Sequence, residues 1–141
     1  MAIINTGIGS AFLKFRFTDE DGDVVSSFRM NPADIKVAIR AEEVSKYLEE
    51  KKTALSGNMT AADMAVFNDE LEEKICYVLG YDARSELFRA PLTATTILPS
   101  GDLFAVTVMD KIVEAVKPEI EKRRANMEKA AAKYTARYDG V

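Results

Sequence analysis

The sequence predicts an α+β fold that is mostly α, in which an N-terminal β-hairpin packs on three to four helices and the last helix is long. Two short segments near the N-terminus alternate apolar and polar residues, which is the pattern of half-buried strands. Later segments place apolar residues three and four apart, as the buried face of a helix requires. The final segment is rich in helix-forming residues but poor in residues suited to a core.

Length and composition indicate one globular domain. A chain of 141 residues with 48% hydrophobic and 30% charged residues is large enough to bury a core without disulfides or metals. We expect a single domain over residues 1–141, made of a flexible N-terminus (1–10), a β-hairpin (11–30), a helical core (31–116) and a C-terminal helix and tail (117–141).

The hairpin is predicted from two strands and the turn between them. Residues 12–17 (FLKFRF) alternate apolar and basic positions, and residues 24–30 (VVSSFRM) alternate in the same way. The turn-forming run DEDGD, from Asp19 to Asp23, lies between them. A two-stranded hairpin is marginal alone, so we expect helices to cover its apolar face.

Two helices are predicted from their end signals. Asn31 and Pro32 are residues typical of the N-cap and first position of a helix, and the apolar pattern then continues to about Lys52. A second helix begins after Thr60, which opens a capping-box pattern, and ends at Gly80, a residue suited to the left-handed C-cap. Its outer face is strongly acidic, so it is expected to be solvated, although such a face also suits a basic partner.

Residues 78–93 (VLGYDARSELFRAPLT) raise the question whether they form a working loop or a joint between helices. Asp82 is placed to cap a short helical turn after Gly80. We expect Leu87 and Phe88 to form an apolar plug between the second and third helices. No base, nucleophile or metal-ligand set converges on this stretch, which favours the joint.

A third helix follows a loop that contains proline and glycine. Its apolar positions are Leu103, Phe104, Val108, Ile112, Val113 and Val116. Pro118 either kinks this helix or opens a fourth one at its first turn. From Lys117 to Tyr138 the chain has seven basic and three acidic residues, although its net charge is −4.

The C-terminal helix carries the candidate binding residues. Two rows repeat along it every seven residues: Ile120, Met127 and Tyr134, and Arg124, Ala131 and Tyr138. Such a sparse seam suits packing against a helix of another protein. There are two alternatives. The helix could fold back on its own domain, with the aliphatic parts of its lysine and arginine side chains lying over the surface. The same basic side chains could instead contact nucleic acid. The candidate partner-binding residues are Ile120, Met127, Ala131, Tyr134 and Tyr138.

Composition argues against several functions. The net charge of −4 and a pI near 5.0 disfavour a surface built to neutralise nucleic-acid phosphates. Histidine is absent, which removes the commonest general base and metal ligand. The single Cys76 lies in an apolar segment and is expected to be a buried small hydrophobe in a reducing compartment. We therefore expect no enzyme, no catalytic residues, no cofactor and no metal site.

Two local patterns do not match the binding motifs that they resemble, and a third motif does not occur. Counted from Asp19, the acidic run has Gly22 in fourth place and Met30 in twelfth, where a calcium-binding EF-hand needs glycine in sixth and glutamate in twelfth. The two early glycines lack the strand and third glycine of a dinucleotide site, and no P-loop pattern occurs.

No signal sequence or apolar run of about 18 residues is visible, which predicts a cytoplasmic protein without membrane contact.

The hairpin is followed by FRMNPADIKVAIRAEEV, KICYVLGYDARSELFRAPLT, a glycine-containing loop, KPEIEKRR and KYTARY. The order of these features resembles small proteins of the tail-gene module in phages and prophages of Gram-positive bacteria. The resemblance runs from about Phe12 to Tyr138. One departure is Val78-Leu79 before Gly80, where the family would have an aromatic residue.

This resemblance implies a protein that acts by binding. Proteins of this group are regarded as tail assembly chaperones or tail-associated proteins. A chaperone of this kind would coat the long helical tape measure protein in the host cytoplasm until tail-tube subunits polymerise around it, with both proteins as partners. Coating a long chain needs many copies, so a homo-oligomer or weak multivalent contacts are expected. The alternative is a structural virion component of the tail or connector, of the tail-completion type.

Overall fold

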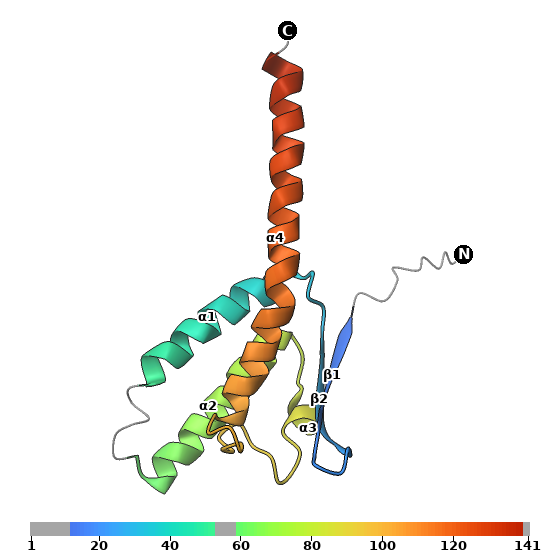
Figure 1. Cartoon of the computed structure of the whole chain (residues 1–141). Coiled ribbons are helices and arrows are strands. Elements are labelled where there is room, and N and C mark those ends of the chain that lie inside the picture. The colour runs from blue at the N-terminus through green and yellow to red at the C-terminus, as the bar shows by residue number, and fades with distance from the viewer. Residues whose placement is uncertain (1–11, 53–58, 140–141) are drawn as a thin grey trace, which may run out of the picture.

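The computed structural model describes residues 12–52 and 59–139, with side chains of 136–139 and of Lys52 left aside (Figure 1). The elements are β1 (Leu13–Thr18), β2 (Val24–Met30), α1 (Ile35–Lys52), α2 (Ala61–Leu79), α3 (Arg84–Leu87) and α4 (Phe104–Asp139). This arrangement confirms the predicted α+β fold with an N-terminal hairpin and a long C-terminal helix. The N-terminus predicted to be flexible (1–10) lies outside the described residues.

The acidic run before β2 forms the hairpin turn. The Asp19 side chain accepts hydrogen bonds from the backbone N–H groups of Asp21 and Asp23, both at 3.0 Å. Gly22 adopts φ +83°, a left-handed conformation that glycine takes without strain. The two strands pair antiparallel, and Phe15 lies opposite Phe28. The turn chemistry therefore sets the register of the strands.

The inner face of the hairpin packs on the start of α4. Phe28 is fully buried and stacks on Phe15 with ring centroids 4.8 Å apart. Phe17 meets the edge of Phe104, the first residue of α4, at 5.2 Å. Because helices cover its apolar face, the hairpin becomes part of the core.

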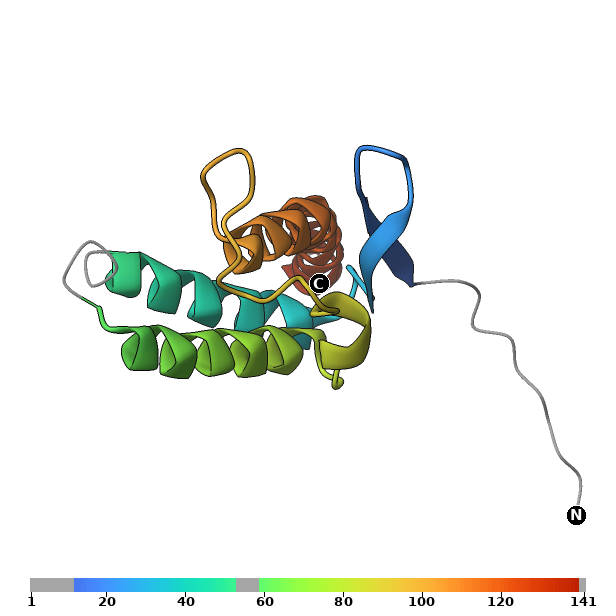
Figure 2. The ribbon, with the colours of Figure 1, turned by 90° about the horizontal axis from the view of Figure 1, so that it is seen from below.

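The three longer helices form the other layer of the molecule. Figure 2 shows α1 and α2 side by side and antiparallel, with α4 crossing them and the hairpin at one end. Helix α2 begins with the predicted capping box of Thr60 and Asp63 and ends at Gly80 in the left-handed conformation. Within residues 12–52 and 59–139, no helix is both long and apolar enough to cross a membrane.

The first helix begins later than the sequence predicts. Asn31 caps a tight turn by accepting the N–H of Ala33 at 3.0 Å. Helix α1 starts at Ile35, and Asp34 caps it by accepting the N–H of Lys36 at 2.9 Å. Two successive side-chain caps are present, and the second determines the start of the helix.

Pro118 neither ends α4 nor opens a new helix, since it lies inside one helix of 36 residues. Proline lacks the N–H that would bond to the carbonyl four residues earlier, so the backbone loses one hydrogen bond at this point. The helix continues outward from the body beyond Pro118 (Figure 1).

Helix α3 is the joint predicted from residues 78–93. Leu87 is fully buried, whereas Phe88 is partly buried and meets the edge of Phe104 at 6.0 Å. The buried Ser26 of β2 donates its hydroxyl hydrogen to the carbonyl of Leu87 at 2.5 Å. The plug therefore fixes α3 on the hairpin as well as on the start of α4.

A Leu87→Ala substitution tests this joint. Leu87 has 0% exposure, so we expect the free energy of unfolding to fall by about 2–5 kcal/mol. Ile97→Ala is the control, because Ile97 is 71% exposed and should change it by less than about 0.5 kcal/mol. Chemical denaturation followed by circular dichroism measures both values, and equal losses would contradict the burial of Leu87.

Two tyrosine–glutamate pairs connect α1 to α2. Tyr47 donates to Glu70 at 2.7 Å, and Tyr77 donates to Glu43 at 2.9 Å. The ammonium group of Lys74 lies 4.1 Å from the centre of the Tyr47 ring. Burial, followed by the hydrogen bond to Glu70, raises the pKa of Tyr47 to about 12, because both disfavour the phenolate.

The raised pKa of Tyr47 predicts a loss of stability in alkali. The folded pKa of about 12 exceeds the unfolded value of 10.0, so the folded state holds this proton more tightly. Its contribution to the free energy of unfolding is complete below the unfolded pKa and disappears as the pH rises through the folded pKa. We expect Tyr47→Phe to reduce the fall in stability over this interval and to remove the latest tyrosinate transition in an absorbance titration. An unchanged titration would contradict the contact with Glu70.

Candidate protein-binding surface on the C-terminal helix

Helix α4 is buried along one half and exposed along the other. Its buried residues all precede Pro118 and are Phe104, Ala105, Val108, Met109, Ile112 and Val116. Every side chain from Glu121 to Thr135 is exposed. The helix therefore extends away from the body rather than folding back on it (Figure 1). We call residues 121–139 the projecting half.

Apolar side chains run along α4 at a spacing of seven residues. They are Val106, Val113, Ile120, Met127 and Tyr134, which we call the heptad stripe. Met127 is 72% exposed, Tyr134 is 65% exposed and Val113 is 38% exposed. A repeat of seven residues keeps side chains on one line of a helix that winds around another helix. Exposed apolar side chains on such a line mark a surface for a partner helix.

The predicted binding residues fall on this surface in part. Ile120 is partly buried against the core, whereas Met127, Ala131 and Tyr134 are exposed. The side chain of Tyr138 lies outside the described residues.

The sequence interpretation missed the continuation of the row toward the N-terminus, where Val106 and Val113 keep the same spacing. Val113 was expected among the apolar residues of the third helix, yet it is partly exposed.

Three hollows follow the stripe and form one trough along α4. The first, of about 360 Å³, lies between α1 and α4 and is floored by Leu48, Val106, Met109 and Val113. The second also has Val113 in its wall and extends to Ile120. The third shares Ile120 and extends to Met127 and Ala131 beside Ile35 of α1. Because neighbouring hollows share these residues, we treat them as one feature, the α4 trough.

The charges change sign along the α4 trough. At the body end its wall contains Glu49, Asp110 and Glu114, and the first hollow has no basic residue in its lining. The third hollow is bordered by Arg123 and Arg124, with Glu128 as its one acid. The chain from Lys117 to Tyr138 has seven basic residues against three acidic ones. One end of α4 thus offers an acidic groove and the other a basic helix.

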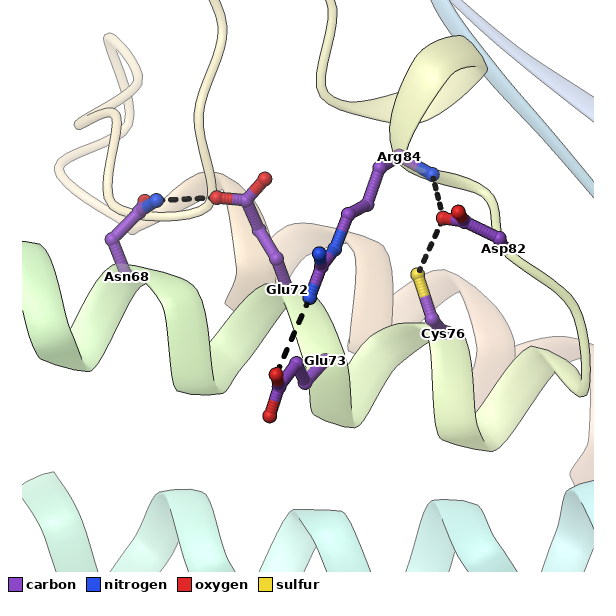
Figure 3. A network of polar contacts seen from close by, with 6 residues as sticks. All are labelled: Asn68, Glu72, Glu73, Cys76, Asp82 and Arg84. Atoms are coloured by element: carbon purple, nitrogen blue, oxygen red, sulfur yellow. Dashed lines mark hydrogen bonds and ion pairs between the residues drawn. The ribbon is translucent and has the colours of Figure 1, made fainter.

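Residues 68–84 form a polar network that joins α2 to α3 (Figure 3). Arg84 approaches Glu73 to 3.7 Å, and the Asp82 carboxylate accepts the backbone N–H of Arg84 at 3.3 Å. Asn68 donates to Glu72, and burial, which outweighs this hydrogen bond, raises the pKa of Glu72. Glu72 was expected in water, yet its side chain is partly buried.

Cys76 belongs to the same network and is partly exposed rather than buried as predicted. Its thiol lies 3.9 Å from the Asp82 carboxylate. The contacts of Glu73 with Arg84 and of Cys76 with Asp82 connect α2 to α3 and to the segment before it, so they support the joint around α3.

The acidic turn brings carboxylate oxygens of Asp19, Asp21 and Asp23 within 4.8 Å of one another. All three residues are exposed, and Asp19 already binds two backbone N–H groups. These bonds give the Asp19 carboxylate a role in the turn.

Removing the projecting half tests whether the body folds without it. A chain that ends at Glu121 keeps every buried residue of α4, so in dilute solution its free energy of unfolding should change by less than about 0.5 kcal/mol. A chain that ends at Asp110 loses Ile112 and Val116 and should be strongly destabilised. Thermal unfolding followed by circular dichroism compares them. A large loss in the longer chain would show that the projecting half supports the body.

Comparison with protein-family models, curated proteins and solved structures finds no match to this chain. The surface is therefore interpreted from its geometry. An apolar stripe on a projecting helix, a trough beside it and a change of charge along it all suit contact with another helix.

Proposed function

We propose that this chain is a non-enzymatic protein of phage tail morphogenesis, a tail assembly chaperone that binds the tape measure protein in the cytoplasm of the bacterial host. The observation that carries the proposal is the heptad stripe on a helix that projects from a folded body. The resemblance of the sequence to tail-module proteins supplies the identity of the partner. The heptad stripe is the contact surface in this proposal.

The physical match is between two helices. A tape measure protein is a very long helical chain with apolar stripes, which aggregates unless those stripes are covered. The exposed side chains of Met127 and Tyr134 would pack on such a stripe, while the basic residues around them would meet acidic positions of the client. The folded body then keeps the covered helix in solution through its charged surface.

Weak contacts suffice when they are repeated. A short two-helix contact has modest affinity, but many copies bound along one client hold it strongly through multivalency. The same weakness lets tail-tube subunits displace the chaperone as the tube polymerises. A chaperone needs this reversibility, whereas a virion component must stay bound.

Four ionisable groups with shifted pKa values have structural partners, which favours binding over catalysis. Tyr47 and Tyr77 bond to glutamates across α1 and α2. Burial raises the pKa of Tyr81, whose hydroxyl oxygen accepts the N–H of Arg29 at 2.9 Å. Glu72 is held by Asn68. Each bond connects two elements or two turns of a helix.

The test is binding to the tape measure protein encoded by the same genome. The stripe variant carries Met127→Asp and Tyr134→Asp. The control carries Ala125→Asp and Ala132→Asp, which add the same charges at the same spacing on the opposite face of the helix. Burying each apolar side chain contributes about 1.5–3 kcal/mol, so the stripe variant should bind at least about a hundredfold more weakly. The control should bind within about threefold of the unchanged chain.

Co-expression and co-purification with the tape measure protein give the readout, and mass spectrometry of purified particles completes it. A chaperone is absent from mature particles. Its presence there would support the structural tail or connector component instead. Equal binding by the stripe variant and the control would refute the stripe as the contact surface.

A further inference from the structure

The α4 trough and the projecting half are complementary to each other. The body end of the trough has an apolar floor of Val106 and Val113 and the carboxylates of Asp110 and Glu114. The projecting half presents Met127 and Tyr134 among basic residues. An acidic apolar groove and a basic apolar helix of this kind are the two sides of a helix-in-groove contact.

The projecting half cannot reach the body end of the trough of its own chain, which lies beside Val106 and Val113. Both belong to one continuous helix, Phe104–Asp139, and the projecting half leaves the body in the direction of the helix axis. A helix cannot turn back without breaking its hydrogen bonds. The complementary helix must therefore come from a second molecule.

The spacing of the heptad stripe is symmetric about Ile120. Val113 and Met127 lie seven residues from it on either side, and Val106 and Tyr134 lie fourteen. If two copies of α4 lie antiparallel with Ile120 at the centre, Val113 faces Met127 of the second copy and Val106 faces its Tyr134. The same contacts then form twice, which is the condition for a closed two-fold interface.

Charge determines the orientation. In the antiparallel arrangement Arg124, which lies beside the stripe, faces position 116 of the second copy, two residues from its Glu114. A parallel arrangement would place the two basic halves together, and like charges across a helix pair repel. The paired stripe covers four successive steps of seven residues.

We propose that two copies of this chain form an antiparallel dimer, in which the projecting half of each α4 occupies the body end of the α4 trough of the other. The dimer covers the surface that the proposed function assigns to the tape measure protein, so the second copy and the client compete for it. The inference itself does not depend on the identity of the client. In the dimer the apolar stripe is shielded whenever no client is bound.

Chemical cross-linking tests the arrangement in the full chain. Cys76 is replaced by alanine in all variants, and a short bismaleimide links cysteines that lie close together. Ile120→Cys alone should cross-link two copies, since it lies at the two-fold axis. Val113→Cys combined with Met127→Cys should also give a covalent dimer. Within one helix these two positions are about 21 Å apart, too far for the reagent to link them in the same chain.

Two cysteine controls distinguish the alternatives. Met127→Cys alone should give no covalent dimer, because its counterpart lies about 21 Å away along the antiparallel pair. Efficient cross-linking of this variant would show a parallel pair and overturn the proposed arrangement. Ala125→Cys alone lies on the opposite face and should remain uncross-linked, and its cross-linking would show that the reagent traps random encounters.

Sedimentation measures the dimer without cross-links. The unchanged chain and the Ala125→Asp/Ala132→Asp control should dimerise, while the Met127→Asp/Tyr134→Asp variant should be monomeric. Arg124→Glu should weaken the dimer at least about tenfold. Adding Glu114→Lys should restore it. Circular dichroism confirms that each variant folds.

The inference is overturned if the unchanged chain stays monomeric at its solubility limit. It is also overturned if reversing the charges on both sides of the interface does not restore the dimer. The outcomes are independent of the proposed function. A dimer that fails to bind the tape measure protein leaves this inference standing and removes the function. A monomer that binds the tape measure protein supports the proposed function and removes the dimer.

Discussion

The packing around Phe104 is the interaction on which the rest of the structure depends. Its ring meets the edges of Phe17 from the hairpin and Phe88 from the segment after α3. The backbone N–H of Phe104 donates to Thr96 at 2.8 Å, and that of Ala105 donates to Ala94 at 3.0 Å. These bonds satisfy two donors that the first turn of a helix leaves open. The start of α4 is therefore fixed to three other segments, and the direction of the whole helix follows from it.

The sequence predicted the elements that carry local signals. The Asp-Gly turn, the capping box at Thr60 and the C-cap at Gly80 each depend on residues within a few positions of one another, and the structure contains all three. The start of α1 was wrong by three residues because Asp34 is a second cap beyond Asn31. Cys76 and Glu72 were misplaced for a related reason. Their exposure depends on α3 and its neighbours, which pack against α2 from farther along the chain.

The candidate surface was predicted only in part. The spacing of Ile120, Met127 and Tyr134 identifies a face of the helix, but periodicity alone does not say what that face meets. A helix folded back on its own domain would show the same rows. What decides between them is tertiary: every side chain from Glu121 to Thr135 is exposed, so this stretch of α4 extends beyond the body. The trough was not predictable, because it combines α1 and α4 across a long stretch of sequence.

Pro118 affects the dynamics of the long helix α4. It lies where the buried half of α4 meets the exposed half, and it removes one of the backbone hydrogen bonds that would cross this boundary. Cooperative melting in a helix passes from turn to turn through such bonds. Fraying that starts at the exposed end therefore meets an interruption before it reaches Val116 and the core. Amide hydrogen exchange would divide α4 at this residue, with a fast outer unit and a slow inner one that opens only with the body. The protein can then lose and regain the helical structure of its projecting half without unfolding the domain that carries it.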